Sequence, residues 1–179
     1  MDVVAQALKG AQDKAAALFD EVVERGLIRA GKMESELSRE VHEIARDRYG
    51  LRRHWHKRVV RAGPNALLGY YDETVDRAIG ADDVVFVDLG PVFEEWEADF
   101  GRSYAIGPDP NKHRLVADLS EAFAAGKEHF RKTPELSAGQ LYDFVQSLAA
   151  PRGWEFGKLT FPSSSGEPNS PKTATWSAK

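Results

Sequence analysis

The sequence contains no cysteine among its 179 residues. This absence excludes disulfide bonds, zinc sites built from cysteine and catalysis by a thiol, so any metal would have to be bound by carboxylates and histidines. No apolar run approaches the roughly 20 residues that span a bilayer, and we expect no membrane partner. The N-terminus carries Asp2 and Lys9 and lacks the basic-then-apolar order of a signal peptide, which favours a cytoplasmic protein.

Basic residues are also scarce relative to acidic ones. Lysine and arginine number 24 against 28 aspartates and glutamates, giving a net charge of −4 and a pI of about 5.8. A general nucleic-acid binder is usually basic, so we expect no nucleic-acid partner. With 42% hydrophobic residues, the composition is that of an ordinary globular protein, and the length suits one domain.

The spacing of apolar residues predicts an α+β fold. Helical periodicity covers residues 3–25, 33–49, 112–131 and 138–149, whereas β-forming residues gather near 54–60, 66–71, 84–88 and 95–106. Two helices, several antiparallel strands and two more helices differ from an alternating βαβ order. Beyond Gly157 the apolar periodicity fades and proline and serine increase. We therefore expect a domain over residues 1–157 and a disordered tail over residues 158–179.

Two aspartates stand out within the strand-rich region. Asp88 ends the apolar run Val84–Val87, and Asp99 opens the segment Asp99–Tyr104. If the chain folds back near Phe93 and Glu94, the two aspartates lie opposite each other on antiparallel strands, where like charges are destabilising. Two close carboxylates cannot both ionise cheaply, and a divalent cation removes that cost. The pattern is consistent with a metal site at Asp88 and Asp99, while the residues alone favour two strand-end aspartates that cap loops.

These two segments resemble a known signature. Asp88-Leu89-Gly90 followed by Asp99-Phe100-Gly101-Arg102-Ser103 is similar to the paired-aspartate motif of the pita-bread metallopeptidases, which include aminopeptidase P, prolidase, methionine aminopeptidase and the creatinases. Gly31–Leu37 resembles the family's helix junction, and Ala62–Ala66 resembles its Gly-x-Asn-Ala strand. The resemblance covers about residues 10–157. It implies an incomplete, C-terminally truncated pita-bread domain with an antiparallel sheet and helices on one face.

The resemblance also implies a function. Family members hold two divalent metals with two aspartates, a histidine and two glutamates, and Asp88 and Asp99 match the aspartates. The metals would be manganese, or cobalt, zinc or iron. The implied activity is that of a metal-dependent aminopeptidase or Xaa-Pro peptidase acting on a peptide or small amide. Tyr70 stands nearest to the family's substrate-contacting histidine and is the candidate substrate-binding residue.

The chain departs from the family pattern downstream. The family histidine lies in a Gly-His-x-x-Gly segment after the second aspartate, whereas no histidine follows His129 here. Glu155 and Glu167 lack the surroundings of the family glutamates. The sequence thus predicts an incomplete dinuclear site, assigns no catalytic residue, and leaves open a non-catalytic binding protein on the same scaffold or an unrelated α+β interaction module. A sheet face left exposed would favour a homo-oligomer.

Several other polar residues have two interpretations each. His54 and His56 are two residues apart, so on a strand both rings would point to one face and could form a small metal site. The favoured interpretation is that both lie in a solvent-exposed segment at the start of a strand. Arg102 either pairs with an acidic group near the aspartates or lies on the surface. We expect Glu94, Glu95 and Glu97 to lie in a solvent-exposed turn. We expect His113 and His129 to be surface or packing residues of a helix.

Overall fold

The structure is a computed structural model that describes residues 2–157 and 175–178. The chain divides into two compact units, Met1–Leu68 with Glu73–Asp109, and Gly69–Asp72 with Pro110–Lys179. Of the tail predicted over residues 158–179, only 175–178 are described, and the rest lies outside the described residues. Throughout the described part of the chain, every helix is too short or too polar to cross a membrane.

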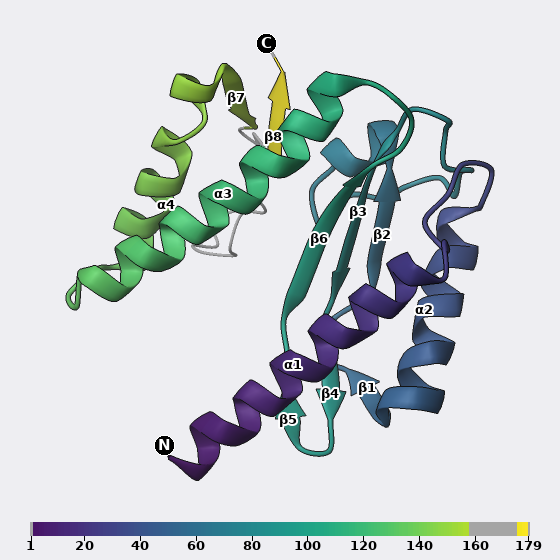
Figure 1. The fold of residues 1–179 in the computed structure, drawn as a ribbon, viewed down its shortest axis with the longest axis horizontal. Helices are drawn as coiled ribbons and strands as arrows, with labels where there is room; N and C mark the ends of the chain where they lie inside the picture. The colour runs from purple at the N-terminus through teal and green to yellow at the C-terminus, as the bar shows by residue number, and fades with distance from the viewer. Residues whose placement is uncertain (1, 158–174, 179) are drawn as a thin grey trace, which may run out of the picture. The chain divides into compact units, whose positions relative to one another are not determined.

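The first unit contains two helices and two small antiparallel sheets (Figure 1). Its helical elements are α1 (Val3–Glu24), α2 (Glu34–Tyr49) and the 3-10 helix η1 (Gly63–Leu67). One sheet has the order β2 (Val59–Ala62), β3 (Val84–Leu89), β6 (Phe100–Ala105). The other has the order β1 (Leu51–His54), β4 (Pro91–Phe93), β5 (Trp96–Glu97). The helices predicted over 3–25 and 33–49 are therefore confirmed.

Strand β3 shows why this sheet has one covered face. Along it, buried and half-buried residues alternate, and Val85, Val87 and Leu89 are almost fully buried. Helix α1 supplies Ala15, Leu18 and other apolar residues at helical spacing to the same core cluster. Because successive strand residues point to opposite faces, Asp88 lies on the face away from this core. The helices thus cover one face, as predicted.

Three predicted strands differ from the observed ones, and the one near residues 54–60 is interrupted at 55–58, between β1 and β2. Residues 66–71 form no strand, because η1 begins at Gly63, whose φ of +52° turns the chain directly after β2. The strand predicted over residues 95–106 is divided between the two sheets, as β5 and β6. The division arises at a tight β4–β5 hairpin in which Glu94 has a φ of +59°.

A buried polar network joins the two segments that support the family resemblance. The Glu34 carboxylate, at the start of α2, accepts hydrogen bonds from the Ala62 backbone N–H at 2.5 Å and from the Asn65 side-chain amide at 2.9 Å. The same amide donates to the Val75 carbonyl at 3.0 Å. This network fixes α2 to the end of β2, and so holds the sheet against its helical cover.

The second unit is a helical pair with a short hairpin. It contains α3 (Pro110–Lys132), α4 (Ala138–Ser147), the 3-10 helix η2 (Ala150–Arg152), β7 (Trp154–Gly157) and β8 (Thr175–Ala178). Trp154 anchors the unit, since its side chain is fully buried and its indole N–H donates to Asp118 at 2.6 Å. The two predicted C-terminal helices are confirmed, with ends shifted by a few residues.

Replacement of Asn65 by alanine tests the polar network. Asn65→Ala removes two donated hydrogen bonds and leaves the Val75 carbonyl and one Glu34 oxygen unsatisfied, so we expect a loss of about 1–3 kcal/mol of unfolding free energy. The exposed amide of Gln12 provides the control, and Gln12→Ala should change stability by less than about 0.5 kcal/mol. Urea denaturation measures both, and equal stabilities would contradict the proposed role of Asn65.

The buried carboxyl of Glu34 should give stability a characteristic pH dependence. Burial raises the pKa of Glu34 above its ordinary 4.5, although the Asn65 and Ala62 hydrogen bonds oppose this shift. Because the pKa of Glu34 is higher in the folded than in the unfolded state, its protonated carboxyl contributes to the free energy of unfolding. That contribution is complete below pH 4.5 and is lost as the pH rises through the folded-state pKa. Wild type should therefore lose stability relative to Glu34→Gln as pH rises from about 4 to 7. A difference in unfolding free energy between wild type and Glu34→Gln that stays constant over this pH range would contradict this expectation.

Candidate metal centre

Asp88 is positioned by β3, on the face away from the core. Its pairing partner in β6 is Gly101, which has no side chain, and a Cβ there would lie 3.7 Å from an Asp88 carboxylate oxygen. Burial raises the pKa of the Asp88 carboxyl above its usual 3.8; the nearby His56 lowers it and Asp99 raises it further. The aspartate thus sits where its negative charge is costly without a cation.

Asp99 reaches the same place from the residue before β6. In the observed register Asp88 faces Gly101 and Leu89 faces Phe100, so the predicted direct pairing of Asp88 with Asp99 is wrong. The chain leaves the sheet after Leu89 to form the β4–β5 hairpin, and pairing with β3 resumes only at Phe100. Asp99 therefore precedes the ladder, with a side chain that is 70% exposed.

A histidine completes the cluster. Within the described residues, His56, Asp88 and Asp99 form a group whose ligand atoms, one from each residue, all lie within 4.8 Å of one another. The His56 Nε2 atom lies 3.9 Å from an Asp99 carboxylate oxygen. His56 follows β1, whereas the aspartates flank the β4–β5 hairpin, so three separate segments of the first unit meet here.

His54 does not share this surface with His56. Strand β1 ends at His54, and the chain bends at residues 55 and 56, which breaks the period-two alternation. The His54 Nε2 atom lies 3.4 Å from Nδ1 of His42 on α2, and burial lowers the pKa of His54 to about 4. The less favoured interpretation, in which both rings point to one face and form a joint metal site, therefore does not hold.

The clustered donors suit a divalent cation. Two carboxylates supply hard, negatively charged oxygens, and an imidazole nitrogen adds affinity for zinc, cobalt, iron or manganese. The raised pKa of Asp88 indicates a charge that a cation would stabilise. The chemistry of the donor set thus fits the group that the family resemblance implies.

The other predicted residues have different surroundings. Arg102 is exposed, donates to the Gly101 carbonyl at 2.8 Å and covers the Phe100 ring at 4.0 Å. Tyr70 belongs to the second unit, where its ring packs edge-on against Tyr71, and its role as a substrate contact stays a prediction. Glu155 lies exposed on β7, and Glu167 lies outside the described residues.

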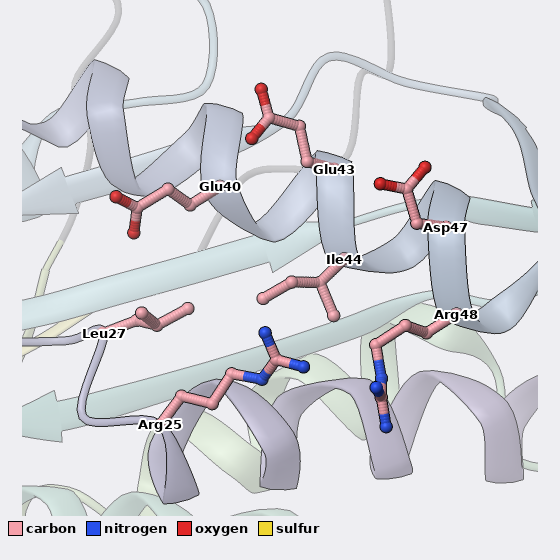
Figure 2. A pocket seen from close by; sticks show the side chains of 7 residues that line it. All are labelled: Arg25, Leu27, Glu40, Glu43, Ile44, Asp47 and Arg48. Atoms are coloured by element: carbon pink, nitrogen blue, oxygen red, sulfur yellow. The ribbon is translucent and has the colours of Figure 1, made fainter.

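A cavity of about 330 Å³ in the first unit does not include the cluster. Figure 2 shows it between acidic side chains of α2 and the basic side chains of Arg25 and Arg48. Both arginines form ion pairs with Glu21, whose side chain is 12% exposed, and Glu40 pairs with the buried Lys32. Since these charges neutralise each other within the protein, the cavity is a weaker candidate site than the three-residue cluster.

Comparisons with known proteins agree with the geometry. The sequence profile of metallopeptidase family M24 matches residues 6–166. The structure is similar to X-Pro aminopeptidase from Thermotoga maritima MSB8, with a TM-score of 0.67, 22% identity, and coverage of 86% of this chain and 43% of that chain. Xaa-Pro dipeptidase from Bacillus anthracis gives a TM-score of 0.67 and 22% identity, covering 86% and 42% of the two chains.

A third similar structure is dipeptidase PepE from Mycobacterium ulcerans, with a TM-score of 0.63, 25% identity, and coverage of 82% of this chain and 39% of that chain. No curated protein sequence matches the chain. The chain spans about two fifths of the length of these structures. The expected α+β pita-bread fold is confirmed, and the chain belongs to metallopeptidase family M24.

Proposed function

We propose that this chain provides metal-binding residues of a metal-dependent hydrolase that cleaves peptides, of the aminopeptidase or Xaa-Pro peptidase type. The observation that carries the proposal is the meeting of Asp88 and Asp99 at the end of the β3–β6 ladder. Membership of family M24 supports the same assignment, because the two aspartates match its paired-aspartate motif.

The electrostatics of the aspartate pair support metal binding. Asp88 is removed from water enough to raise its pKa, and the neighbouring carboxylate of Asp99 adds to the cost of ionising it. A divalent cation offsets both contributions, whereas a single lysine or arginine would neutralise only one charge. In the metal site that we propose, Asp88 and Asp99 would each contribute oxygen ligands, with manganese, cobalt, zinc or iron as the metal.

When bound, such a cation acts as a Lewis acid toward a carbonyl and generates a nucleophile from water near neutral pH. The chain's own contribution is to hold one carboxylate on the β3–β6 ladder and the other directly before it. Backbone pairing from Val84 to Leu89 holds Asp88, and the first residue of β6 holds Asp99 in place. Ligands held in this way are compatible with peptide hydrolysis, and membership of family M24 favours that reaction over simple cation storage.

The names of the similar structures support the substrate class. They are an X-Pro aminopeptidase, an Xaa-Pro dipeptidase and a dipeptidase, so we propose a peptide with a free amino terminus as substrate, with proline after the scissile bond. Tyr70 would contact that substrate as a hydrogen-bond donor, since a phenol is a poor base near neutral pH.

Metal binding by the aspartates is tested by calorimetric titration of the full chain with manganese, cobalt and zinc. Wild type should bind with micromolar or tighter affinity, and Asp88→Asn should weaken binding at least about tenfold, since it removes a ligand charge. Asp13→Asn removes an exposed carboxylate from α1 and should leave affinity unchanged. Binding no tighter than millimolar by wild type would overturn the proposal.

Hydrolysis is tested separately with metal-loaded protein and a set of dipeptides that differ only in having proline or alanine second. We expect release of the first residue from the proline-containing member, and loss of release in Asp99→Asn. Amino-acid analysis of the products measures it. Tight metal binding without hydrolysis of any member would instead support a non-catalytic peptide-binding protein on this scaffold.

A further inference from the structure

His56 lies at the candidate metal centre, although the M24 resemblance assigns no role to this position. We infer that His56 binds the metal through Nε2, so that His56, Asp88 and Asp99 together hold one divalent transition metal. The inference rests on the proposed metal binding by the two aspartates, and adds to it a nitrogen ligand from the segment before β2.

The hydrogen bonding of the imidazole selects the tautomer that a metal ligand needs. The His56 Nδ1 atom lies 2.7 Å from the Lys57 carbonyl oxygen, which can only accept a hydrogen bond. Nδ1 therefore carries the proton in the neutral ring, and Nε2 carries the lone pair. Metal-binding histidines are typically oriented in this way, with the second ring nitrogen donating to a carbonyl or carboxylate.

The ring of His56 is also held sterically. Trp55 contacts it edge-on with ring centroids 4.4 Å apart, and Trp55 is itself fixed by donating its indole N–H to the Ala98 carbonyl at 3.0 Å. A Cβ at Gly90 would lie 2.3 Å from His56 Cδ2 and 2.6 Å from Nε2. The absence of a side chain at Gly90 thus makes the space that the imidazole occupies.

The position of Nε2 relative to the carboxylates completes the argument. The side chain of His56 is only 11% exposed, and its Nε2 atom lies 3.9 Å from an Asp99 oxygen. That separation is longer than a hydrogen bond and shorter than the roughly 4.0–4.4 Å that two ligands at about 2.0–2.2 Å from one metal can span. Asp88, Asp99 and His56 would then occupy three positions of one coordination sphere.

A nitrogen ligand changes which metals the site prefers. Carboxylates alone suit magnesium, calcium and manganese, whereas an added imidazole favours cobalt and zinc. We therefore expect cobalt or zinc to bind in the presence of millimolar magnesium.

The test compares two histidines that are two positions apart. His56→Gln removes the inferred ligand, and His54→Gln is the matched control, because the His54 ring faces His42. Cobalt(II) binding to the full chain is measured by calorimetry and visible absorption. We expect His56→Gln to lose at least about tenfold in affinity, the smallest effect typical of losing even an outer-shell partner, and His54→Gln to bind as wild type does.

Proton NMR of the cobalt-loaded protein gives a readout that a merely structural role would not produce. A coordinated imidazole shows a strongly shifted, exchangeable N–H signal from its second nitrogen, here Nδ1–H. Wild type and His54→Gln should show one such signal and His56→Gln none. If His56→Gln fails to fold, the spectra of wild type and His54→Gln decide the question together, because the signal requires a histidine ligand and its loss in His54→Gln would identify His54 instead.

The outcomes separate this inference from the proposed function. No cobalt binding by wild type would overturn both. Binding that depends on Asp88 but not on His56, or a wild-type spectrum without a shifted N–H signal, would overturn the role of His56 alone. Binding lost in His54→Gln would place the metal at the His42–His54 pair and would also overturn the inference.

Discussion

The structure of the first unit depends on the antiparallel pairing of β3 with β6. Six residue pairs, from Val84–Ala105 to Leu89–Phe100, fix which side chains face the helices and which face away. Because strand side chains alternate, burial of Val85, Val87 and Leu89 against α1 and α2 places Asp88 on the opposite face. A shift of the register by one residue would bury that carboxylate in the apolar core. The same strand register is therefore required both by the core and by the candidate metal centre.

The same pairing brings three unrelated segments together at one end of the ladder. A glycine makes this approach possible at one position, because Gly90 leaves room for the His56 ring. The polar network of Glu34 and Asn65 fixes α2 to the end of β2, and β2 in turn pairs with β3. The rigidity of the site therefore comes from the fold around it, as a site with preset ligands requires.

The sequence predicted much of this arrangement, and the misses have physical causes. Helical periodicity located the four α-helices of the described residues, and the aspartate motif located the candidate site, because both signals are local. The direct Asp88–Asp99 pairing was wrong, since the β4–β5 hairpin, turning at Glu94 with positive φ, moves Asp99 out of the ladder. His56 was assigned to a solvated strand because its neighbours are distant in sequence. Gly90, two positions after Asp88, is the sequence feature that could have indicated space for the His56 ring beside the aspartates.

The central claim is that Asp88, Asp99 and His56 surround a divalent metal. The most direct test is an anomalous difference map, recorded at the cobalt absorption edge, from crystals of the full chain grown with cobalt(II). The account predicts one dominant peak in the first unit, about 2.0–2.2 Å from a carboxylate oxygen of each aspartate and from His56 Nε2. A dominant peak elsewhere, between His42 and His54 for example, with none at the aspartates would contradict it.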